Sequence, residues 1–462
     1  MQRFSALILC LGIASWSTAA PAGPKDREVL LDVQPMAAPV PALRYQLMPE
    51  VAEMNPGNAV QAYLRAFGGQ HDFFFSKEQG EERERLLKCP LTDIKPGQLK
   101  DYGGSALRQA DHAARMEYAD WNMLPQMREH GYMLLLPEIQ QLRTLASALA
   151  VRGRGQLVDK DFEGATRTLK TLFALARHLG EYPTLITGLV GSAIAQIGLN
   201  LVEEFIQQPG APNLYWALTA IPQPLVDVRK AVSAERIIGD ATYGPLMDPK
   251  HVWSVDEIAT AKQKFKEFAA MLVNEADERI DAEQWLKGRV ADEKWLQASR
   301  KGLVDAGYPA TPVSQYPPEQ VLLYHLSHKA RAQLDEVAKW VPVPYWQAEA
   351  ALEEAAKKPV EMEEKLTKAM VFNLGKLRAT HVRLEQRIDL LRIAEAIRLE
   401  AAKNGGKLPA SLSDVSAPIP VDPVTGKAFE YKLDGMTALV SGRATPISSG
   451  VMQYRYEIRL HK

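Results

Sequence analysis

The stretch from Arg383 to Leu460 limits the fold more than any other part of the chain, because it specifies three kinds of element in a fixed order. It begins with an apolar stripe at helical spacing, which predicts a long helix. Two glycines at 405 and 406 end that helix, and Pro409 prevents it from resuming. The stripe consists of Leu384, Ile388, Leu391, Ala394 and Ile397.

The residues after this helix are typical of a small antiparallel sheet. A strand over 428–433 is followed by an Asp434-Gly435 hairpin turn and by a partner strand over 437–441. The last segment alternates between apolar and polar residues, which predicts a strand with one buried face. Its apolar set is Met452, Tyr454, Tyr456, Ile458 and Leu460. We expect the helical stripe to pack against this sheet.

Residues 59–345 have the pattern of a helical body, in which apolar residues at three-four spacing are separated by short Pro/Gly loops. The proline-rich residues 23–58 predict an extended arm. Within the arm, 55–58 has turn chemistry, and its last residue is suited to cap a helix that reaches Phe67. The predicted fold class is mainly α: stacked helical hairpins, followed over 346–462 by a small C-terminal α+β module of long helix and antiparallel sheet.

The segment from Tyr182 to Val202 contains no charged residue and is long enough to span a membrane. Polar side chains and glycines at 188, 191 and 198 interrupt it, and charged helices flank it. Glycines at related positions permit close helix contact in a soluble core as well as in a membrane. We predict a buried helix at the centre of the body, and no stable transmembrane segment in the mature chain.

The first 22 residues have the composition of a secretory signal peptide, with Arg3 as the positive charge and an apolar core over 7–13. Cys10 follows Leu9 rather than a small residue, which favours ordinary cleavage over lipid modification. The protein is therefore expected to be exported, either periplasmic or extracellular. Cys89 would be its one remaining cysteine, and a single thiol forms no internal disulfide. We expect Cys89 to be a buried or partly buried thiol.

The overall charge is close to neutral, with 55 basic and 56 acidic residues. The chain has no basic stripe with interleaved aromatic residues, so nucleic acid is not an expected partner. It also has no Lys/Arg block that would attract it to an anionic membrane surface. Residues 348–403 form a long charged helical stretch, in which Glu363, Glu364, Lys365 and Lys368 are expected to form a solvated face with local ion pairs. The partner that we expect is another envelope protein.

The C-terminal segment resembles the globular part of type II secretion major pseudopilins. The resemblance rests on Ala396-Ile397-Arg398-Leu399, Gly405 or Gly406, Leu408-Pro409, Leu412, Asp422-Pro423, Gly426, Phe429 and Tyr431. The chain departs from that family because it begins with an ordinary signal segment. Residues 441–445 also lack the acidic side chains of the pseudopilin calcium loop. Filament formation and calcium binding are therefore not expected.

A second resemblance concerns one helical hairpin. Residues 161–165, Asp-Phe-Glu-Gly-Ala, resemble the start of the second helix of a tetratricopeptide unit, and Ala176 stands where a small residue lets helices approach. One hairpin does not make a repeat array. The whole arrangement is similar to uncharacterised secreted bacterial proteins that join a helical body to such a tail. Stacked helix pairs would imply a concave surface for a protein or peptide.

His325 and His328 are the residues nearest to a metal-binding pattern, because a spacing of three places them on one helical face. Glu319 or Asp335 could supply a third ligand. No glutamate stands where helical zinc hydrolases carry one. We expect ordinary surface or core histidines here, and no metal or other cofactor.

The sequence assigns no catalytic residue. His71 and Asp72 could begin a catalytic constellation, but no serine in a Gly-x-Ser-x-Gly elbow completes it. The phenylalanines at 73–75 are expected to form a buried anchor instead. Gly153 and Gly155 lack the Lys-Ser/Thr of a phosphate-binding loop.

The sequence therefore favours a non-enzymatic interaction or scaffold protein of the cell envelope, with an unknown specific role. The alternative is an envelope hydrolase that acts on polysaccharide or peptidoglycan through a pair of carboxylates, whose separation in space the sequence does not give. A pocket that holds two acidic residues in unequal environments would favour the hydrolase.

Overall fold

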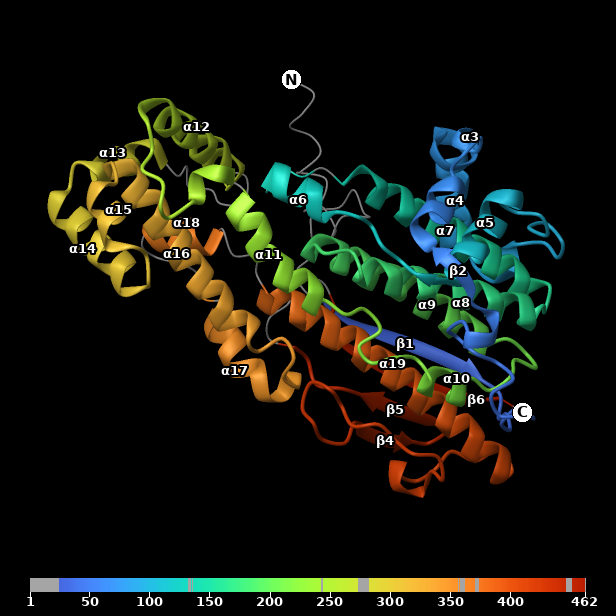
Figure 1. The fold of residues 1–462 in the computed structure, drawn as a ribbon. Helices are drawn as coiled ribbons and strands as arrows, with labels where there is room; N and C mark the ends of the chain where they lie inside the picture. Colours follow the sequence, from blue (N-terminus) through green and yellow to red (C-terminus); the bar gives the residue numbers. More distant parts are fainter. Residues whose placement is uncertain are drawn as a thin grey trace.

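The computed structural model describes residues 25–131, 134, 136–241, 244–272, 282–355, 357, 362–369, 374–445 and 451–461. Within these ranges the protein is mainly helical, with a small mixed sheet of C-terminal strands and one N-terminal strand. Helices α7 to α9 lie over the sheet, and a second group of helices, α12 to α16 with α18, extends to one side (Figure 1). The signal segment predicted over 1–22 lies outside the described residues.

Helices occupy most of the described chain, as the predicted fold class requires. The α-helices are α2 Ala59–Arg65, α3 His71–Phe75, α4 Lys77–Lys88, α5 Gly104–Ala114, α6 Leu124–His130, α7 Pro137–Val158, α8 Phe162–Gly180, α9 Leu185–Ile206, α10 Tyr215–Thr219, α11 Arg229–Ala241, α12 Val255–Leu272, α13 Ala282–Val290, α14 Glu293–Asp305, α15 Ala310–Gln315, α16 Pro318–Ala338, α17 Tyr345–Ala355, α18 Met362–Ala369 and α19 Leu374–Lys403. Short 3-10 helices are η1 Val51–Glu53, η2 Leu91–Asp93, η4 Gly244–Met247 and η5 Leu412–Asp414.

The four-stranded sheet has the strand order β1-β6-β5-β4. Its strands are β1 Lys25–Val33, β4 Glu430–Asp434, β5 Thr437–Ser441 and β6 Val451–Leu460. The pairs β4–β5 and β5–β6 are antiparallel, whereas β1 runs parallel to β6. Tyr454, Tyr456 and Ile458 are buried, which confirms the predicted inward face of the last strand. This face meets α19, whose predicted apolar stripe is also buried.

The N-terminal arm contains structure that its prolines concealed. The pattern predicts only an extended arm over 23–58, whereas the structure places 25–33 in the sheet as β1. The turn predicted at 55–58 is wrong, because these residues form β2 Asn55–Asn58, paired with β3 Met116–Tyr118. The ladder is interrupted between its two paired positions, where Gly57 has a φ of 131°. The residue types that predict a turn therefore form an irregular position within a short strand.

Hydrogen bonds confirm the predicted starts of two helices and the end of α19, whereas α2 ends at Arg65, before the predicted Phe67. The side chain of Asn58 accepts a backbone hydrogen bond of 3.1 Å at the start of α2. The side chain of Asp161 does the same at 2.9 Å at the start of α8. After α19, Gly405 and Gly406 have φ values of 64° and 80°, and the N–H of Gly406 donates to the carbonyl of Ala401 at 2.8 Å. This bond ends the helix as the glycine pair predicts.

Helix α9 is long and apolar enough, by length and composition, to cross a membrane. It is nevertheless mostly buried inside the protein, with 67% of its most apolar window covered. It packs against α7, α8 and α19. A Cβ added at Gly191 would lie 2.8 Å from the carbonyl oxygen of Ala176 on α8, and one at Gly198 would lie 2.9 Å from the ring of Phe173. The helix is a core element, and its glycines allow α8 to approach.

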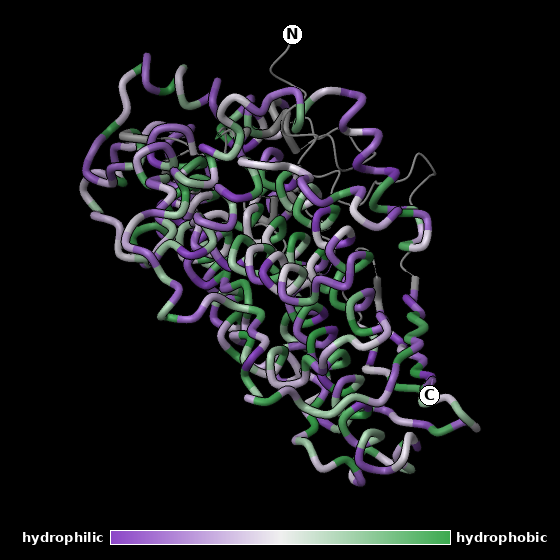
Figure 2. Tube along the Cα trace, turned by 90° about the vertical axis from the view of Figure 1, so that its right-hand side faces the viewer, coloured by the Kyte–Doolittle hydropathy of each residue, from purple (hydrophilic) through white to green (hydrophobic). Residues whose placement is uncertain are grey.

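The two largest hydrophobic clusters described lie in different parts of the molecule. The first runs from Leu31 to Ile458 and so includes the arm, the helical body and the terminal sheet. The second runs from Leu246 to Leu366, in η4, α12 to α16, α18 and the loops that join them. Helix α11 lies between the two regions, and α16 extends from the second toward the first, where its Leu334 belongs to the first cluster (Figure 1). Apolar and polar residues alternate along the helical coils, as amphipathic packing requires (Figure 2).

We expect Gly191→Ala to destabilise the protein by about 1–3 kcal/mol, because the added methyl group would overlap a backbone oxygen that cannot rotate away. Gly302→Ala in α14 is the matched control, since nothing lies within 4 Å of its added Cβ. That control should be neutral or stabilising by up to about 1 kcal/mol. Urea unfolding measures both. Equal stability of the two variants would contradict the close contact between α8 and α9.

Candidate functional site

Helix α19 brings a series of polar and charged side chains into the protein interior. Seven of them are at most 5% exposed: His381, Arg383, Gln386, Arg387, Asp389, Glu395 and Arg398. These side chains are enclosed because α9, α10 and α17 pack around the helix. Buried polar groups require partners, and those of α19 find them on several different elements.

Arg387 and Glu203 form the central ion pair of this series. Arg387 is fully buried, and its Nη2 lies 2.7 Å from Oε1 of Glu203 on α9. The same carboxylate oxygen accepts a hydrogen bond from the hydroxyl of Tyr456 on β6. The other oxygen lies 3.0 Å from Arg27 on β1, and Asn200 accepts from both guanidinium groups. One carboxylate thus joins α9, α19, β1 and β6.

The electrostatics of this cluster keep Arg387 charged and Tyr456 protonated. Burial, the largest single influence, lowers the pKa of Arg387, but Glu203 together with Tyr456 and Tyr454 outweighs it and holds the pKa above its ordinary value. Burial, followed by Glu203, raises the pKa of Tyr456 well above its usual range. The tyrosine therefore remains protonated and donates. Both carboxylate oxygens of Glu203 are engaged. The cluster therefore joins elements of the fold and has no open position for a substrate.

A second ion pair on α19 fixes the segment that follows β1 and the loop between α9 and α10. Arg398 and Glu395 are both fully buried, with Nη1 2.7 Å from Oε1. Arg398 also donates to the backbone carbonyls of Gln34 and Ala211, each at 2.9 Å. Glu395 accepts from the backbone N–H of Leu214, which precedes α10. A buried pair of this kind specifies an arrangement more than it adds stability.

The structure also brings together Ser192 of α9 and His381 of α19. Their Oγ and Nε2 atoms lie 3.2 Å apart, and both residues are buried. The Nδ1 of His381 donates to the carbonyl of Leu377 at 2.8 Å, which leaves Nε2 as an acceptor. Burial lowers the pKa of His381 to about 4, so the ring is neutral at pH 7. These residue types at this distance are those of a nucleophile and its base.

The surroundings of Ser192 and His381 give them a structural role instead. The Oγ of Ser192 also lies 3.0 Å from the carbonyl of Gly188, the ordinary partner of a serine inside a helix. Val228 covers α9 at that glycine, where an added Cβ would be only 2.6 Å from its side chain. Neither Ser192 nor His381 lines either of the cavities described below. Both residues therefore act as packing and hydrogen-bonding groups between α9 and α19.

His325 and His328, the residues nearest to a metal pattern, both lie on α16. The Nε2 of His325 is 3.0 Å from Glu363 of α18, an acidic partner that the sequence did not suggest. Hydrogen bonding to His325 holds the pKa of Glu363 at about 2, despite partial burial. His328 instead faces the ring of Tyr308. The observed pairing attaches α18 to α16.

The third ligands considered for this pattern lie elsewhere in ion pairs. Glu319 pairs with Lys262 at 3.8 Å, and Asp335 pairs with Arg236 of α11. Among the residues that the structure describes, no group of three or more His, Cys, Asp and Glu side chains could hold a metal ion. The spacing of three therefore brings no ligand set together in this part of the chain.

His71 and Asp72, the possible start of a catalytic constellation, are largely exposed on α3, with Nδ1 and Oδ1 3.8 Å apart. Of the adjoining phenylalanines, Phe74 is buried as predicted. The prediction of a fully buried anchor is wrong for Phe75, which is 40% exposed. Among the described contacts of this exposed pair, the ring of Phe75 lies beside His71, and no further group joins them.

The remaining sequence candidates have packing roles. Cys89 is partly buried, as predicted, with its Sγ 3.8 Å from the carbonyl of Leu86. Gly153 and Gly155 lie inside α7, where an added Cβ would come within 2.3 Å of Leu201 and 2.5 Å of Leu99. These glycines permit close packing around the helix. This role fits the sequence around them, which lacks the residues of a phosphate-binding loop.

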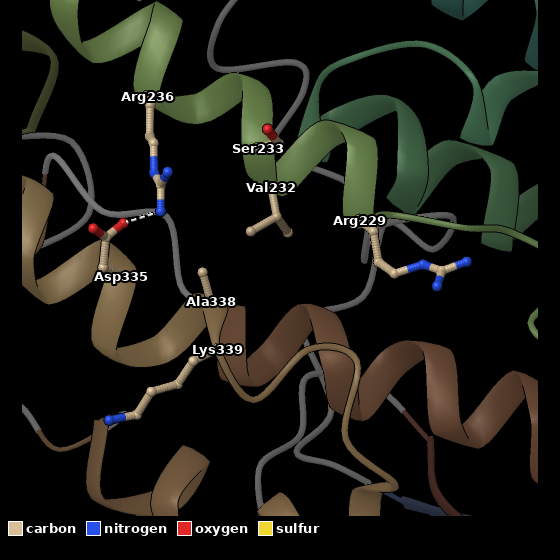
Figure 3. A pocket seen from close by; sticks show the side chains of 7 residues that line it. All are labelled: Arg229, Val232, Ser233, Arg236, Asp335, Ala338 and Lys339. Atoms are coloured by element: carbon tan, nitrogen blue, oxygen red, sulfur yellow. Dashed lines mark hydrogen bonds and ion pairs between the residues drawn. The ribbon is translucent and has the colours of Figure 1, made fainter.

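One cavity of about 270 Å³ lies between α11 and α16. Three cationic residues line it, but they do not converge on a common point (Figure 3). Arg236 meets Asp335 across the cavity, whereas Arg229 and Lys339 point away from each other. Arg229 pairs with Asp227 instead. The cavity therefore has no concentrated positive charge for an anion.

A second cavity, of about 400 Å³, lies at the end of the sheet where β1 and β6 finish. Four separate segments meet here: the arm, the turn after α19, the β4–β5 hairpin and the end of β6. The lining residues are Gln34, Pro35, Gly406, Met436, Leu460 and His461. Met436 at the hairpin tip is 80% exposed. We call this the end-of-sheet groove, and it combines apolar side chains with access from solvent.

Several carboxyl groups that are buried or partly buried have raised pKa values, which can mark functional sites. Burial raises the pKa of Glu235 to about 7 and that of Asp389 to about 6, and it also raises those of Glu204 and Glu385. Glu385 and Asp389 are one helical turn apart on α19. None of these carboxyl groups lines either of the two cavities described above.

The Asp422-Pro423 turn, which contributes to the pseudopilin resemblance, has a clear role in the fold. Asp422 is buried, and its carboxylate accepts from the side chain of Gln386 at 2.9 Å and from the backbone N–H of Arg443 at 2.8 Å. It thereby joins α19 to the end of β5.

Comparisons with protein-family models, curated proteins and solved structures find no match for this chain. All three resemblances therefore remain predictions.

Proposed function

We propose that this protein is an exported, non-enzymatic scaffold protein of the cell envelope, which binds another envelope protein. The observation that carries the proposal is the end-of-sheet groove of about 400 Å³. Residues from four segments line it, so it offers a partner more than the isolated apolar residues that are common on any protein surface. The signal segment expected from the sequence supports the envelope location.

The chemistry of the groove suits a protein partner. Pro35, Met436 and Leu460 offer apolar surface, while Gln34 and His461 provide hydrogen-bonding groups at its margin. Methionine is adaptable in shape and is common in surfaces that accept protein segments. An exposed apolar side chain surrounded by polar groups is also the usual form of an interface anchor.

The alternative, an envelope hydrolase, is supported by one observation. Glu385 and Asp389 lie one turn apart on α19, and the pKa of each is raised by burial. They differ in environment, because Glu385 pairs with Arg378 at 3.5 Å and Asp389 with Arg392 at 2.7 Å. Glycosidases use two carboxyl groups in unequal states. Each of these acids already has a cationic partner, which favours the scaffold proposal.

We expect Met436→Glu to lower affinity for the partner about tenfold or more, because a charge would replace an apolar anchor. Gentle isolation of the tagged protein from its host envelope, with quantitative mass spectrometry, identifies proteins that co-purify in stoichiometric amount. The purified partner is then titrated against the wild type and the variant. Val255→Glu is the matched control, since Val255 is 82% exposed on α12, away from the groove.

The scaffold proposal predicts that Met436→Glu loses the partner and Val255→Glu retains it. Equal binding by both variants would remove the groove from the proposal. An isolated protein that carries glycan fragments in place of a stoichiometric partner would support the hydrolase. In that case Asp389→Asn should abolish glycan release while the groove variant leaves it unchanged.

A further inference from the structure

Strand β1 is an edge strand whose partner comes from the other end of the chain. Its register with β6 runs from the pair Lys25–Val451 to the pair Val33–Leu460. Because the strand order is β1-β6-β5-β4, removal of β1 would leave β6 at the edge of the sheet. An open edge presents unpaired backbone groups, which another strand can join.

The contacts that hold β1 can be made equally well by β1 of a second copy. Leu31 is buried against the core, and Arg27 reaches Glu203 at 3.0 Å. On the solvated face, Glu28 pairs with Arg455 at 3.0 Å. These charged partners lie on α9 and β6, outside the N-terminal arm. The sheet therefore recognises the strand itself, whichever copy the strand belongs to.

The chain after β1 contains a hinge between two fixed points. The first is Met36, whose N–H donates to the carbonyl of Arg398 at 3.1 Å. Met36 therefore belongs with β1. Buried Leu47 anchors the arm to the body further along. Between them, residues 37–43 are largely exposed, with Val40 at 89%. Fully extended, this stretch reaches about 25 Å, which is sufficient to pass to a neighbouring molecule in contact.

We propose that two copies of this chain exchange residues 25–36, so that β1 of each copy completes the sheet of the other. The exchange breaks and remakes the same contacts, so protein concentration and the hinge decide the balance. The product is a symmetric dimer joined by two β1–β6 ladders. This interface is independent of the envelope partner proposed above, because the groove re-forms with Gln34 and Pro35 of the second copy.

Disulfide trapping in a Cys89→Ser background tests the exchange on the full mature protein. Leu30 and Glu457 are paired residues on the solvated face of β1 and β6. Leu30→Cys protein is mixed with Glu457→Cys protein under mild oxidation, and covalent heterodimers are counted by mass. Lys432→Cys replaces Glu457→Cys in the control mixture, because β4 is the opposite edge of the same sheet.

The proposal predicts a heterodimer yield at least fivefold above the control mixture, rising with protein concentration. A Leu30→Cys/Glu457→Cys chain that is oxidised before mixing should remain monomeric, since its strand is locked in place. Light scattering on the unmodified protein is the second measurement. A mass of one chain at every concentration, together with a heterodimer yield no greater than the control, would overturn the proposal. Both measurements use the purified protein without the envelope partner, which separates the exchange from partner binding.

Discussion

We expect Glu203→Gln to lower the free energy of unfolding by about 3–5 kcal/mol, the cost of leaving a buried charge without its partner. The substitution removes the carboxylate that two guanidinium groups share. Arg387 is fully buried, so water cannot replace the lost partner. Arg27 would lose its 3.0 Å contact to the same group, which loosens β1 as well. Urea unfolding, followed by circular dichroism, measures the loss.

Two further variants show whether the effect arises from the unpaired charge. Glu457→Gln removes an exposed ion pair with Arg459 and should cost no more than about 1 kcal/mol. Glu203→Gln combined with Arg387→Met removes both buried charges and should recover a large part of the loss. A Glu203→Gln protein within about 1 kcal/mol of wild type would show that α9, α19 and the sheet do not depend on this carboxylate.

The sequence predicted those parts of the fold that local patterns determine. The apolar stripe of α19, the alternating strand that ends at Leu460 and the glycine pair after α19 all depend on residues close together in the chain. Strand β1 was concealed because its partner residues lie at the opposite terminus, and the prolines around it indicate only an extended chain. Long-range pairing of this kind leaves no local signal.

The candidate site was harder to predict than the fold, for a related reason. Charges on a helix normally indicate a solvated face, and Arg387 and Arg398 carry no mark that separates them from exposed arginines. Their burial depends on elements distant in sequence, such as Glu203 and the carbonyl of Gln34. The partner of His325 likewise lies on a separate helix. Sequence spacing alone could not select these partners.

We expect Glu235→Gln to stabilise the protein by about 3 kcal/mol at pH 8 and to have little effect near pH 4.5. Burial raises the pKa of Glu235 from 4.5 to about 7, while the backbone N–H of Leu185 at the start of α9 partly offsets the shift. A raised carboxyl pKa means that the folded state binds the proton more tightly than the unfolded state. The stability from this group is therefore complete below pH 4.5 and is lost as the pH rises through 7.

The magnitude follows from the size of the shift, because each pKa unit corresponds to about 1.4 kcal/mol. Glutamine cannot ionise, so the variant should lack this part of the pH dependence while its carbonyl still accepts from Leu185. Urea unfolding between pH 4.5 and pH 8 measures the difference from wild type. Glu163→Gln is the control, because Glu163 is half exposed and should show no pH-dependent gain of comparable size. If Glu235→Gln and wild type lost stability in parallel over this range, Glu235 would not be the buried acid that makes α11 and α9 sensitive to pH.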